Sequence, residues 1–211
     1  MASRELMDEV MRRLKRRYRA QMRTSLDHTN PWELLVATML SAQSQDAQVN
    51  KVTARLFKAY RTPKEFARLR PGQLYPYIGV LGLYRGKARN IVATARMLEG
   101  RYGGEVPRAM DDLVKLPGVG RKTANVVLGN AFHVYAGIAI DTHCITVANR
   151  LGIARTRDPV KIEERLMKLV DRKEYANVSH LFIALGRDVC TARVKRCEGC
   201  VLRDICPSSS R

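Results

Sequence analysis

A glycine-containing run between two expected helices carries groups that can bind an anion. Residues 116–120 read Leu-Pro-Gly-Val-Gly, and Arg121 follows at the start of the second helix. Gly118 and Gly120 can take positive φ values and leave no side chain between the backbone and a partner. Backbone N–H groups at a helix N-terminus attract negative charge, so the run suits a nucleic-acid phosphate, gripped without reading a base. An ordinary tight connection between two helices is the alternative.

Two ionisable residues near this run could do covalent chemistry. Lys122 lies in the first turn of the second helix, where the dipole disfavours its ammonium form by only roughly 0.3–1 kcal/mol. A lysine nucleophile must lose its proton, so Lys122 would also need partial burial in a cleft. Asp141 directly precedes another expected helix. From residue type alone, a phosphate contact for Lys122 and a helix cap for Asp141 explain both residues.

Four cysteines near the C-terminus have the spacing of a metal site, C-x6-C-x2-C-x5-C: Cys190, Cys197, Cys200 and Cys206. Four thiolates from so short a segment can hold either Zn²⁺ or a [4Fe–4S] cluster, and the spacing alone leaves both open. Disulfides are not expected in a basic intracellular protein. The fifth cysteine, Cys144, is expected to be a small buried apolar residue.

The composition is typical of a basic globular protein. Its 211 residues carry 38 Lys and Arg against 20 Asp and Glu, and the net charge of +18 favours a polyanion partner. No run of about 18 apolar residues is present, so a membrane-spanning helix is not expected. Residues 1–23 are charged throughout and lack an apolar signal core. We therefore expect the protein to act inside the cell, in the cytoplasm.

The apolar periodicity predicts helices along the whole chain, without the two-residue alternation of strands. Asn30 can cap a helix that Pro31 begins, and the almost wholly apolar run 32–40 predicts that this helix is buried. Glycines and prolines are expected to break the chain between 71 and 87, and 134–140 is expected to be a linker. The remaining helices are expected at 5–22, 49–60, 63–69, 88–98, 111–116, 121–132, 142–151, 158–170 and 174–185. The predicted fold is all-α.

The run 116–127 resembles the helix–hairpin–helix signature of the endonuclease III family, which belongs to the helix–hairpin–helix DNA glycosylases. The resemblance extends to further stretches: 40–43, 82–84, 104–107, 140–143 and the cysteine tail. It covers most of the chain, from about residue 30 to Cys206. One departure is Thr146, which stands where the family often has Arg five residues after the aspartate.

The resemblance implies two helical domains. Residues 25–134 would form a helical barrel that carries the hairpin, and residues 1–24 plus 135–211 would form an iron–sulfur cluster domain. DNA would lie across a cleft between them, with Lys122 and Asp141 on opposite walls. The four cysteines would hold a [4Fe–4S] cluster with no open ligand position, which implies a structural role.

The resemblance also implies an activity. In endonuclease III the lysine matching Lys122 is the Schiff-base nucleophile, and the aspartate matching Asp141 is essential. Adenine- and mismatch-thymine-excising relatives usually carry another residue at the lysine position. The chain is therefore expected to be a bifunctional DNA glycosylase and AP lyase of base excision repair. It would act as a monomer on oxidised or saturated pyrimidines and abasic sites in double-stranded DNA.

The damaged nucleotide must leave the base stack, which opens a hole in the duplex. By resemblance, Gln43 would hydrogen-bond the orphaned base and Leu83 would be an apolar wedge. Weaker pocket candidates are Ser41, Asp46 and His143, of which His143 has a packed core histidine as its alternative. The remaining residues expected at DNA are Gly118, Val119, Gly120, Arg121, Thr123, Arg193, Lys195 and Arg196.

Two other functions remain compatible with these residues. A mismatch thymine or uracil glycosylase of the same fold differs in its substrates, and no single residue here separates it from the first reading. A non-enzymatic iron–sulfur or zinc DNA-binding module would explain the charge, the hairpin and the cysteines. Such a module would not explain why a lysine and an aspartate, Lys122 and Asp141, match the catalytic pair of the family.

Overall fold

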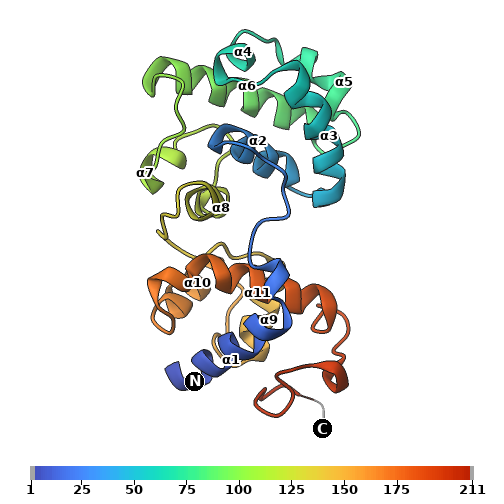
Figure 1. Ribbon diagram of the computed structural model, residues 1–211, viewed down its shortest axis with the longest axis vertical. Coiled ribbons are helices and arrows are strands. Elements are labelled where there is room, and N and C mark those ends of the chain that lie inside the picture. The colour runs from blue at the N-terminus through green and yellow to red at the C-terminus, as the bar shows by residue number, and fades with distance from the viewer. Residues whose placement is uncertain (1–2, 210–211) are drawn as a thin grey trace. The chain divides into compact units, whose positions relative to one another are not determined.

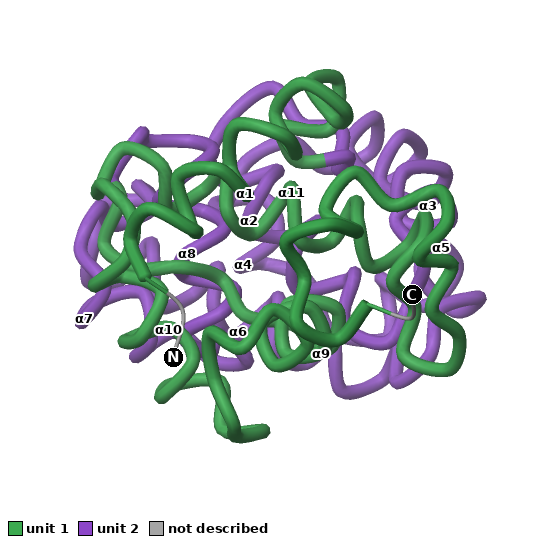
Figure 2. The backbone as a smooth tube through the Cα atoms, turned by 90° about the horizontal axis from the view of Figure 1, so that it is seen from below, with its two compact units in different colours: residues 1–24, 135–211 green, residues 25–134 purple. Residues whose placement is uncertain are grey.

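In the computed structural model, which describes residues 3–209, the chain is helical, and the all-α prediction is confirmed (Figure 1). The described residues form no strand beyond an isolated antiparallel bridge between Cys190 and Lys195. The chain divides into two compact units, Ser25–Val134 and Met1–Thr24 with Tyr135–Arg211 (Figure 2). None of the helices within residues 3–209 combines the length and apolar character that crossing a membrane requires.

The unit Ser25–Val134 is built around one buried helix. Its helices are α2 (Pro31–Ser41), α3 (Asp46–Ala59), α4 (Pro63–Ala67), η2 (Pro71–Leu74), α5 (Tyr75–Ile78), α6 (Tyr84–Arg101), α7 (Met110–Leu113) and α8 (Arg121–Ala131). As predicted, Asn30 caps α2, and its side chain accepts a hydrogen bond from the Glu33 N–H at 2.9 Å. Every residue from 32 to 40 is buried, because α2 packs against α3, α6 and α8.

The predicted break between residues 71 and 87 is only partly correct. Two short helices, η2 and α5, each begin at or next to a proline, whose fixed φ suits the first turn of a helix. Helix α6 begins at Tyr84 rather than at 88, since the Leu83 carbonyl already accepts the Lys87 N–H at 3.1 Å. Gly86 does not end the helix, because one glycine costs only about 1 kcal/mol while α6 buries a full apolar face.

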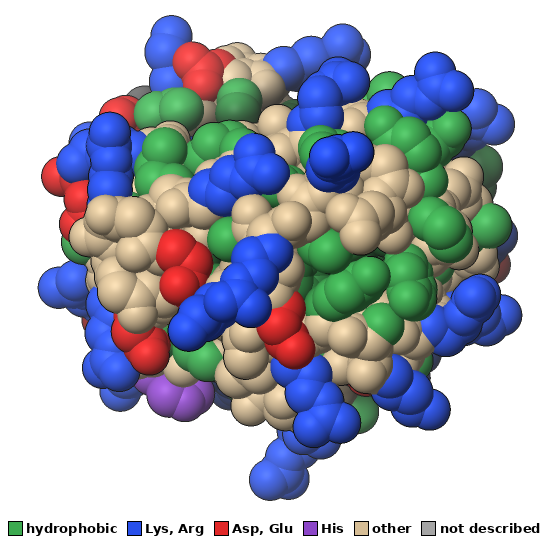
Figure 3. All heavy atoms as spheres, turned by 90° about the horizontal axis from the view of Figure 1, so that it is seen from above, with side chains coloured by type: hydrophobic (Ala, Val, Ile, Leu, Met, Phe, Trp, Pro, Cys, Tyr) green, Lys and Arg blue, Asp and Glu red, His purple; other side chains and the backbone are tan. Residues whose placement is uncertain are grey.

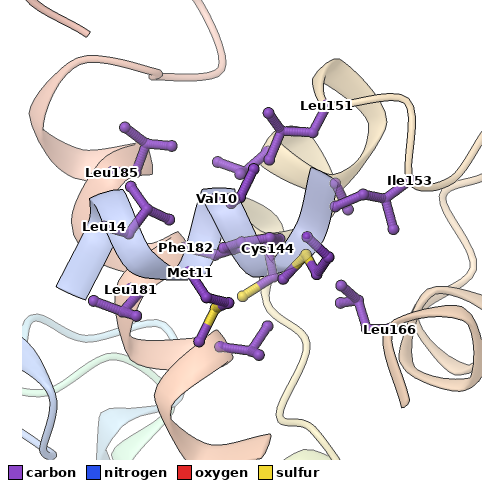
Figure 4. Close-up of a cluster of buried hydrophobic side chains, with 14 of the residues drawn as sticks. Val10, Met11, Leu14, Cys144, Leu151, Ile153, Leu166, Leu181, Phe182 and Leu185 are labelled. Carbon is purple, nitrogen blue, oxygen red and sulfur yellow. The ribbon is translucent and has the colours of Figure 1, made fainter. Parts of the chain in front are cut away.

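The second unit packs the N-terminal helix against the helices that follow residue 141. Its helices are α1 (Arg4–Arg17), η1 (Arg19–Gln21), α9 (Thr142–Arg150), α10 (Pro159–Met167), η3 (Arg172–Glu174), α11 (Tyr175–Asp188) and η4 (Cys197–Gly199). Side chains from α1, α9, α10 and α11 converge in one core (Figure 4). Cys144 lies fully buried there, as predicted. Residues 134–140 form neither helix nor strand, so the expected linker is confirmed.

Candidate active site and cysteine pocket

The hairpin between α7 and α8 depends on Gly118 for its shape. Gly118 has φ +76°, and a Cβ there would lie 2.5 Å from the Asn90 Nδ2. Helix α6 therefore presses on the hairpin, and the Thr94 hydroxyl also donates to the Pro117 carbonyl at 2.9 Å. Gly120, the N-cap of α8, does not use its freedom to take positive φ, because it is extended with φ −90°. No atom lies within 4 Å of a Cβ placed on Gly120, so the space next to its Cα is open.

The N-terminus of α8 is open to an anion. Gly120 has no side chain to cap the helix, and Arg121 is exposed beside it. Backbone N–H groups in the first turn have no partner within a helix, and the positive dipole end favours a phosphate there. The Val119 side chain is buried and its N–H donates to the Leu116 carbonyl at 3.0 Å. Val119 therefore supports the turn and offers neither group to DNA.

Lys122 is the second residue of α8, as predicted, and Thr123 behind it is half-buried. The Lys122 side chain is exposed and makes no hydrogen bond or ion pair with the residues that the structure describes. The partial burial expected from the sequence is therefore not found in the chain itself. The amine stands free next to the anion-binding end of α8.

Asp141 is the N-cap of α9. One carboxylate oxygen, Oδ1, accepts the Cys144 N–H at 2.8 Å. Within the described part of the chain we find no partner for Oδ2, and the residue is half-buried. The predicted cap is thus observed, and it uses one oxygen and fixes the direction of the other. His143, two residues further on, packs against α11, because a Cβ on Gly186 would lie 2.8 Å from the His143 Cβ.

Gln43 and Leu83 share an unusual backbone conformation. Their φ values are 54° and 59°, and the only other non-glycine residue with positive φ among residues 3–209 is His133. Both side chains are exposed, Leu83 at 64%. Left-handed φ costs an L-residue roughly 1–2 kcal/mol, so neither side chain is there for stability. Both positions belong to the set that the family resemblance assigned to the duplex.

The two polar pocket candidates near Gln43 already have partners. The Ser41 hydroxyl donates to the Thr38 carbonyl at 2.9 Å, which makes it part of the last turn of α2. Asp46 begins α3 and accepts a hydrogen bond from the Ser25 hydroxyl at 2.7 Å. Both residues are half-buried. Their contacts support the turn that carries Gln43.

The four cysteines of the tail line one pocket that is partly open to solvent. Four cationic side chains share its lining: Arg150, Lys195, Arg196 and Arg203. Burial, together with the other three thiols, raises the pKa of Cys200, and burial raises that of Cys206. Four thiolates in one pocket therefore need bound cations, and the guanidinium and ammonium groups of its lining suit a centre that keeps net negative charge.

A single zinc ion and a [4Fe–4S] cluster make different demands on the four sulfurs. One Zn²⁺ would draw four sulfurs to about 2.3 Å from a common point. Among the described residues, no three Cys, His, Asp or Glu side chains come together in such a group. A [4Fe–4S] cluster also takes four cysteine ligands, so this donor set is compatible with either group.

Two arginines from outside the loop hold it in place. The Arg150 Nη1 lies 3.2 Å from the Cys190 sulfur and donates to the Thr191 carbonyl at 2.7 Å. Arg150 ends α9, the helix that Asp141 begins. From α1, the Arg13 guanidinium donates to the Val201 carbonyl at 3.0 Å and also pairs with Asp204. Neither arginine could be singled out from the sequence, because Arg13 is one of many basic residues in α1 and Arg150 is an ordinary basic residue in the last turn of α9.

The basic residues expected at DNA are all at the surface. Arg193, Lys195 and Arg196 are exposed, although the Lys195 Nζ donates to the Ser208 carbonyl at 2.9 Å. The hydroxyl of Thr146, where the family often has Arg, donates to the Thr142 carbonyl at 2.9 Å. Figure 3 shows one face on which Lys and Arg side chains outnumber Asp and Glu. Such a surface attracts the phosphate backbone without sequence preference.

Comparison with known proteins identifies the family. The family model of the HhH-GPD superfamily base excision DNA repair proteins matches residues 36–172. Endonuclease III of Bacillus subtilis (strain 168) is 48% identical over 182 residues, which are 86% of this chain and 83% of the relative. Endonuclease III of Escherichia coli (strain K12) is 43% identical over 87% of this chain and 86% of its own. The chain belongs to the endonuclease III family.

The solved structures agree with this membership. A trapped covalent intermediate of endonuclease III with DNA, an estranged-adenine complex, has a TM-score of 0.92 at 42% identity and covers 99% of this chain and 97% of its own. A thermostable thymine-DNA glycosylase shares the fold, with a TM-score of 0.84 at 21% identity. As a member of this family, the protein is a DNA glycosylase and AP lyase of base excision repair, and DNA is its partner.

Proposed function

We propose that the enzyme removes oxidised or saturated pyrimidines from duplex DNA through a Schiff base on Lys122. The free amine at the second position of α8 carries this proposal, because it stands beside the open helix end that suits a phosphate. A phosphate held there brings a deoxyribose within reach of the amine. Since Lys122 is exposed in the free chain, bound DNA itself must exclude water from the amine.

The reaction divides into two steps. The Lys122 Nζ attacks C1′, the damaged base leaves with the electrons of the glycosidic bond, and the sugar ring opens as Nζ loses its protons and forms an imine. Removal of a C2′ proton then breaks the C3′–O bond, which cuts the strand 3′ to the lesion. Asp141 stabilises the positive charge that grows on the sugar, with its cap bond to α9 holding the free oxygen in one direction.

Gln43 and Leu83 fill the space that the flipped nucleotide leaves. Their exposed side chains, held by strained backbone, support this role. An estranged adenine is present in the trapped complex of the relative. Arg121 and the backbone of Gly120 would hold the phosphate, and Arg193, Lys195 and Arg196 would hold the backbone elsewhere. We infer that the enzyme works as a monomer on chromosomal DNA inside the cell.

Borohydride trapping tests this mechanism. The enzyme is incubated with a duplex that carries one thymine glycol, and borohydride reduces any imine to a stable bond. We expect a protein–DNA adduct with the unchanged chain and none with Lys122→Gln, which should still bind the duplex. Base release without an adduct would make this a monofunctional glycosylase, and a panel of uracil and mismatched substrates would identify it. Full cutting by Lys122→Gln would overturn the mechanism.

We propose that Cys190, Cys197, Cys200 and Cys206 hold a [4Fe–4S] cluster. The four thiols share one pocket with four cationic side chains, and membership of the endonuclease III family favours a cluster over a single ion. The cluster would brace the loop that presents Arg193, Lys195 and Arg196. Metal and sulfide analysis of the purified protein tests the proposal. Iron and acid-labile sulfide in equal amounts are expected, and zinc without sulfide would contradict it.

A further inference from the structure

Helix α6 contains a buried lysine that the proposed chemistry does not use. Lys87 is 6% exposed, and its Nζ donates to the Leu40 carbonyl at 2.8 Å and to the Ser44 hydroxyl at 3.0 Å. No carboxylate in the described chain forms an ion pair with it. Burial accordingly lowers the pKa of Lys87. A methionine of similar length would fill the same space without the cost of burying an amine.

The two acceptors of Lys87 lie on either side of the turn that carries Gln43. Leu40 is in the last turn of α2, and the Ser44 N–H donates to the Ser41 carbonyl at 3.0 Å. Gln43 occupies the third position of this four-residue turn, where positive φ normally calls for glycine. Lys87 therefore clamps both ends of a strained turn whose own residue types do not favour it.

The same lysine is tied to the second strained residue. Leu83 is the N-cap of α6, and its carbonyl accepts the Lys87 N–H at 3.1 Å. The two turns also meet directly, because a Cβ on Gly82 would lie 3.7 Å from the Gln43 carbonyl oxygen. One residue thus bonds through its backbone to the Leu83 turn and through its side chain to the Gln43 turn.

Helix α6 extends this arrangement to the hairpin. Asn90 lies against Gly118, and Thr94 donates to Pro117. Together with Leu83 and Lys87, these residues follow the spacing i, i+4, i+7, i+11, which places them on one face of the helix. A single rigid element therefore contacts all three segments that the proposed function brings to DNA.

We propose that Lys87 is a positioning residue that fixes the Gln43 turn against Leu83, so that both side chains enter the duplex together. The proposal rests on the proposed function, in which these two side chains fill the gap left by the flipped nucleotide. In the absence of the clamp, the Gln43 turn relaxes and the two side chains lose their common register. The loss should appear in the flipping-dependent step and much less in the overall affinity for DNA.

A double-mutant cycle tests this role, with single-turnover excision of thymine glycol as the readout. Lys87→Met keeps the length of the side chain and removes both hydrogen bonds. We expect it to slow excision roughly 10–100-fold, as small misplacements do at active sites. In a chain that already carries Gln43→Ala and Leu83→Ala, we expect less than a twofold further loss, because nothing remains to be positioned. Lys58→Met, at an exposed site on α3, is the control for the lost charge.

Each outcome has a separate meaning. Equal losses from Lys87→Met in both backgrounds would overturn the proposal, since Lys87 would then act on something other than the two side chains. Full excision by the Gln43→Ala, Leu83→Ala chain would instead overturn the proposed role of those residues. If Lys87→Met does not fold, Ser44→Ala removes one acceptor at a half-buried site. A smaller loss that again disappears in the double-alanine background would support the proposal, and no loss would overturn it.

Discussion

The variant Leu83→Gly should be more stable than Leu83→Ala, and both variants should repair DNA more slowly than the unchanged protein. Leu83 has φ 59° and ψ 24°, and 64% of it is exposed. The left-handed conformation costs an L-residue roughly 1–2 kcal/mol, and glycine does not bear this cost. Glycine also increases the entropy of the unfolded chain, which returns about 0.4–1 kcal/mol. The difference leaves Leu83→Gly more stable than Leu83→Ala by about 0.5–1 kcal/mol.

Thermal unfolding of the two variants measures this difference directly. For a chain of this size, 1 kcal/mol corresponds to about 2–4 °C in Tm, so we expect Leu83→Gly to melt about 1–4 °C above Leu83→Ala. Excision of thymine glycol should fall in both variants, since both lack the apolar wedge. The two variants should therefore differ in stability while both lose activity.

Two results would refute this reasoning. A lower Tm for Leu83→Gly than for Leu83→Ala would mean that the backbone at this position stores no strain. Excision at the original rate by both variants would mean that the Leu83 side chain does not enter the duplex. Urea unfolding of the same proteins, with unchanged slopes, checks that the two transitions are comparable.

Three further predictions concern the hairpin, the pH dependence and the cysteine loop. Gly118→Ala should lower the free energy of unfolding by about 2–4 kcal/mol, because Gly118 has φ +76° and a Cβ there would clash with Asn90 of α6. Gly120→Ala should lower it by no more than about 1 kcal/mol. Equal losses in the two variants would contradict the geometry. Burial lowers the pKa of His180, so as the pH falls the unfolded chain binds the extra proton before the folded chain does. The free energy of unfolding should therefore decline as the pH falls from about 6.5 through the pKa of the folded state. Urea titrations at several pH values should show that His180→Gln lacks this part of the decline. Arg150→Met removes the hydrogen bonds to the Cys190 sulfur and the Thr191 carbonyl. With the proposed cluster bound, we expect faster release of iron to a chelator and a lower Tm. An unchanged rate of iron release would show that Arg150 does not hold the loop.

Local signals in the sequence were sufficient for most of the helical fold. Asn30, Pro31 and an apolar run predict α2 because capping and burial are both encoded within one stretch. The start of α6 could not be read in the same way, since Gly82 and Gly86 indicate a break. Its true start depends on packing against α2, which no window of sequence contains.

The residues of the candidate site could likewise be predicted only where local sequence signals mark them. The places of Lys122 and Asp141 follow from chain order, because each stands beside a helix start that the sequence marks. The sequence shows that Gly118 and Gly120 can both take positive φ, and the packing of Asn90 against Gly118 alone distinguishes the two glycines. Lys87 was overlooked because a lysine in a helix is normally at the surface. Its burial becomes visible only when α6 lies on α2.

The contacts of α6 explain why a repair enzyme would keep so costly a residue. From Leu83 to Thr94 the helix rises about 16 Å, and over that length it holds the Gln43 turn, the Leu83 turn and the hairpin. In the proposed function, the hairpin grips a phosphate without reading sequence, so it sets only the position of the protein along the duplex. Because a helix transmits this position rigidly, the phosphate contact also fixes where the two side chains meet the base stack. An apolar residue at position 87 would stabilise the fold but would leave the Gln43 turn free to relax, and the register would be lost.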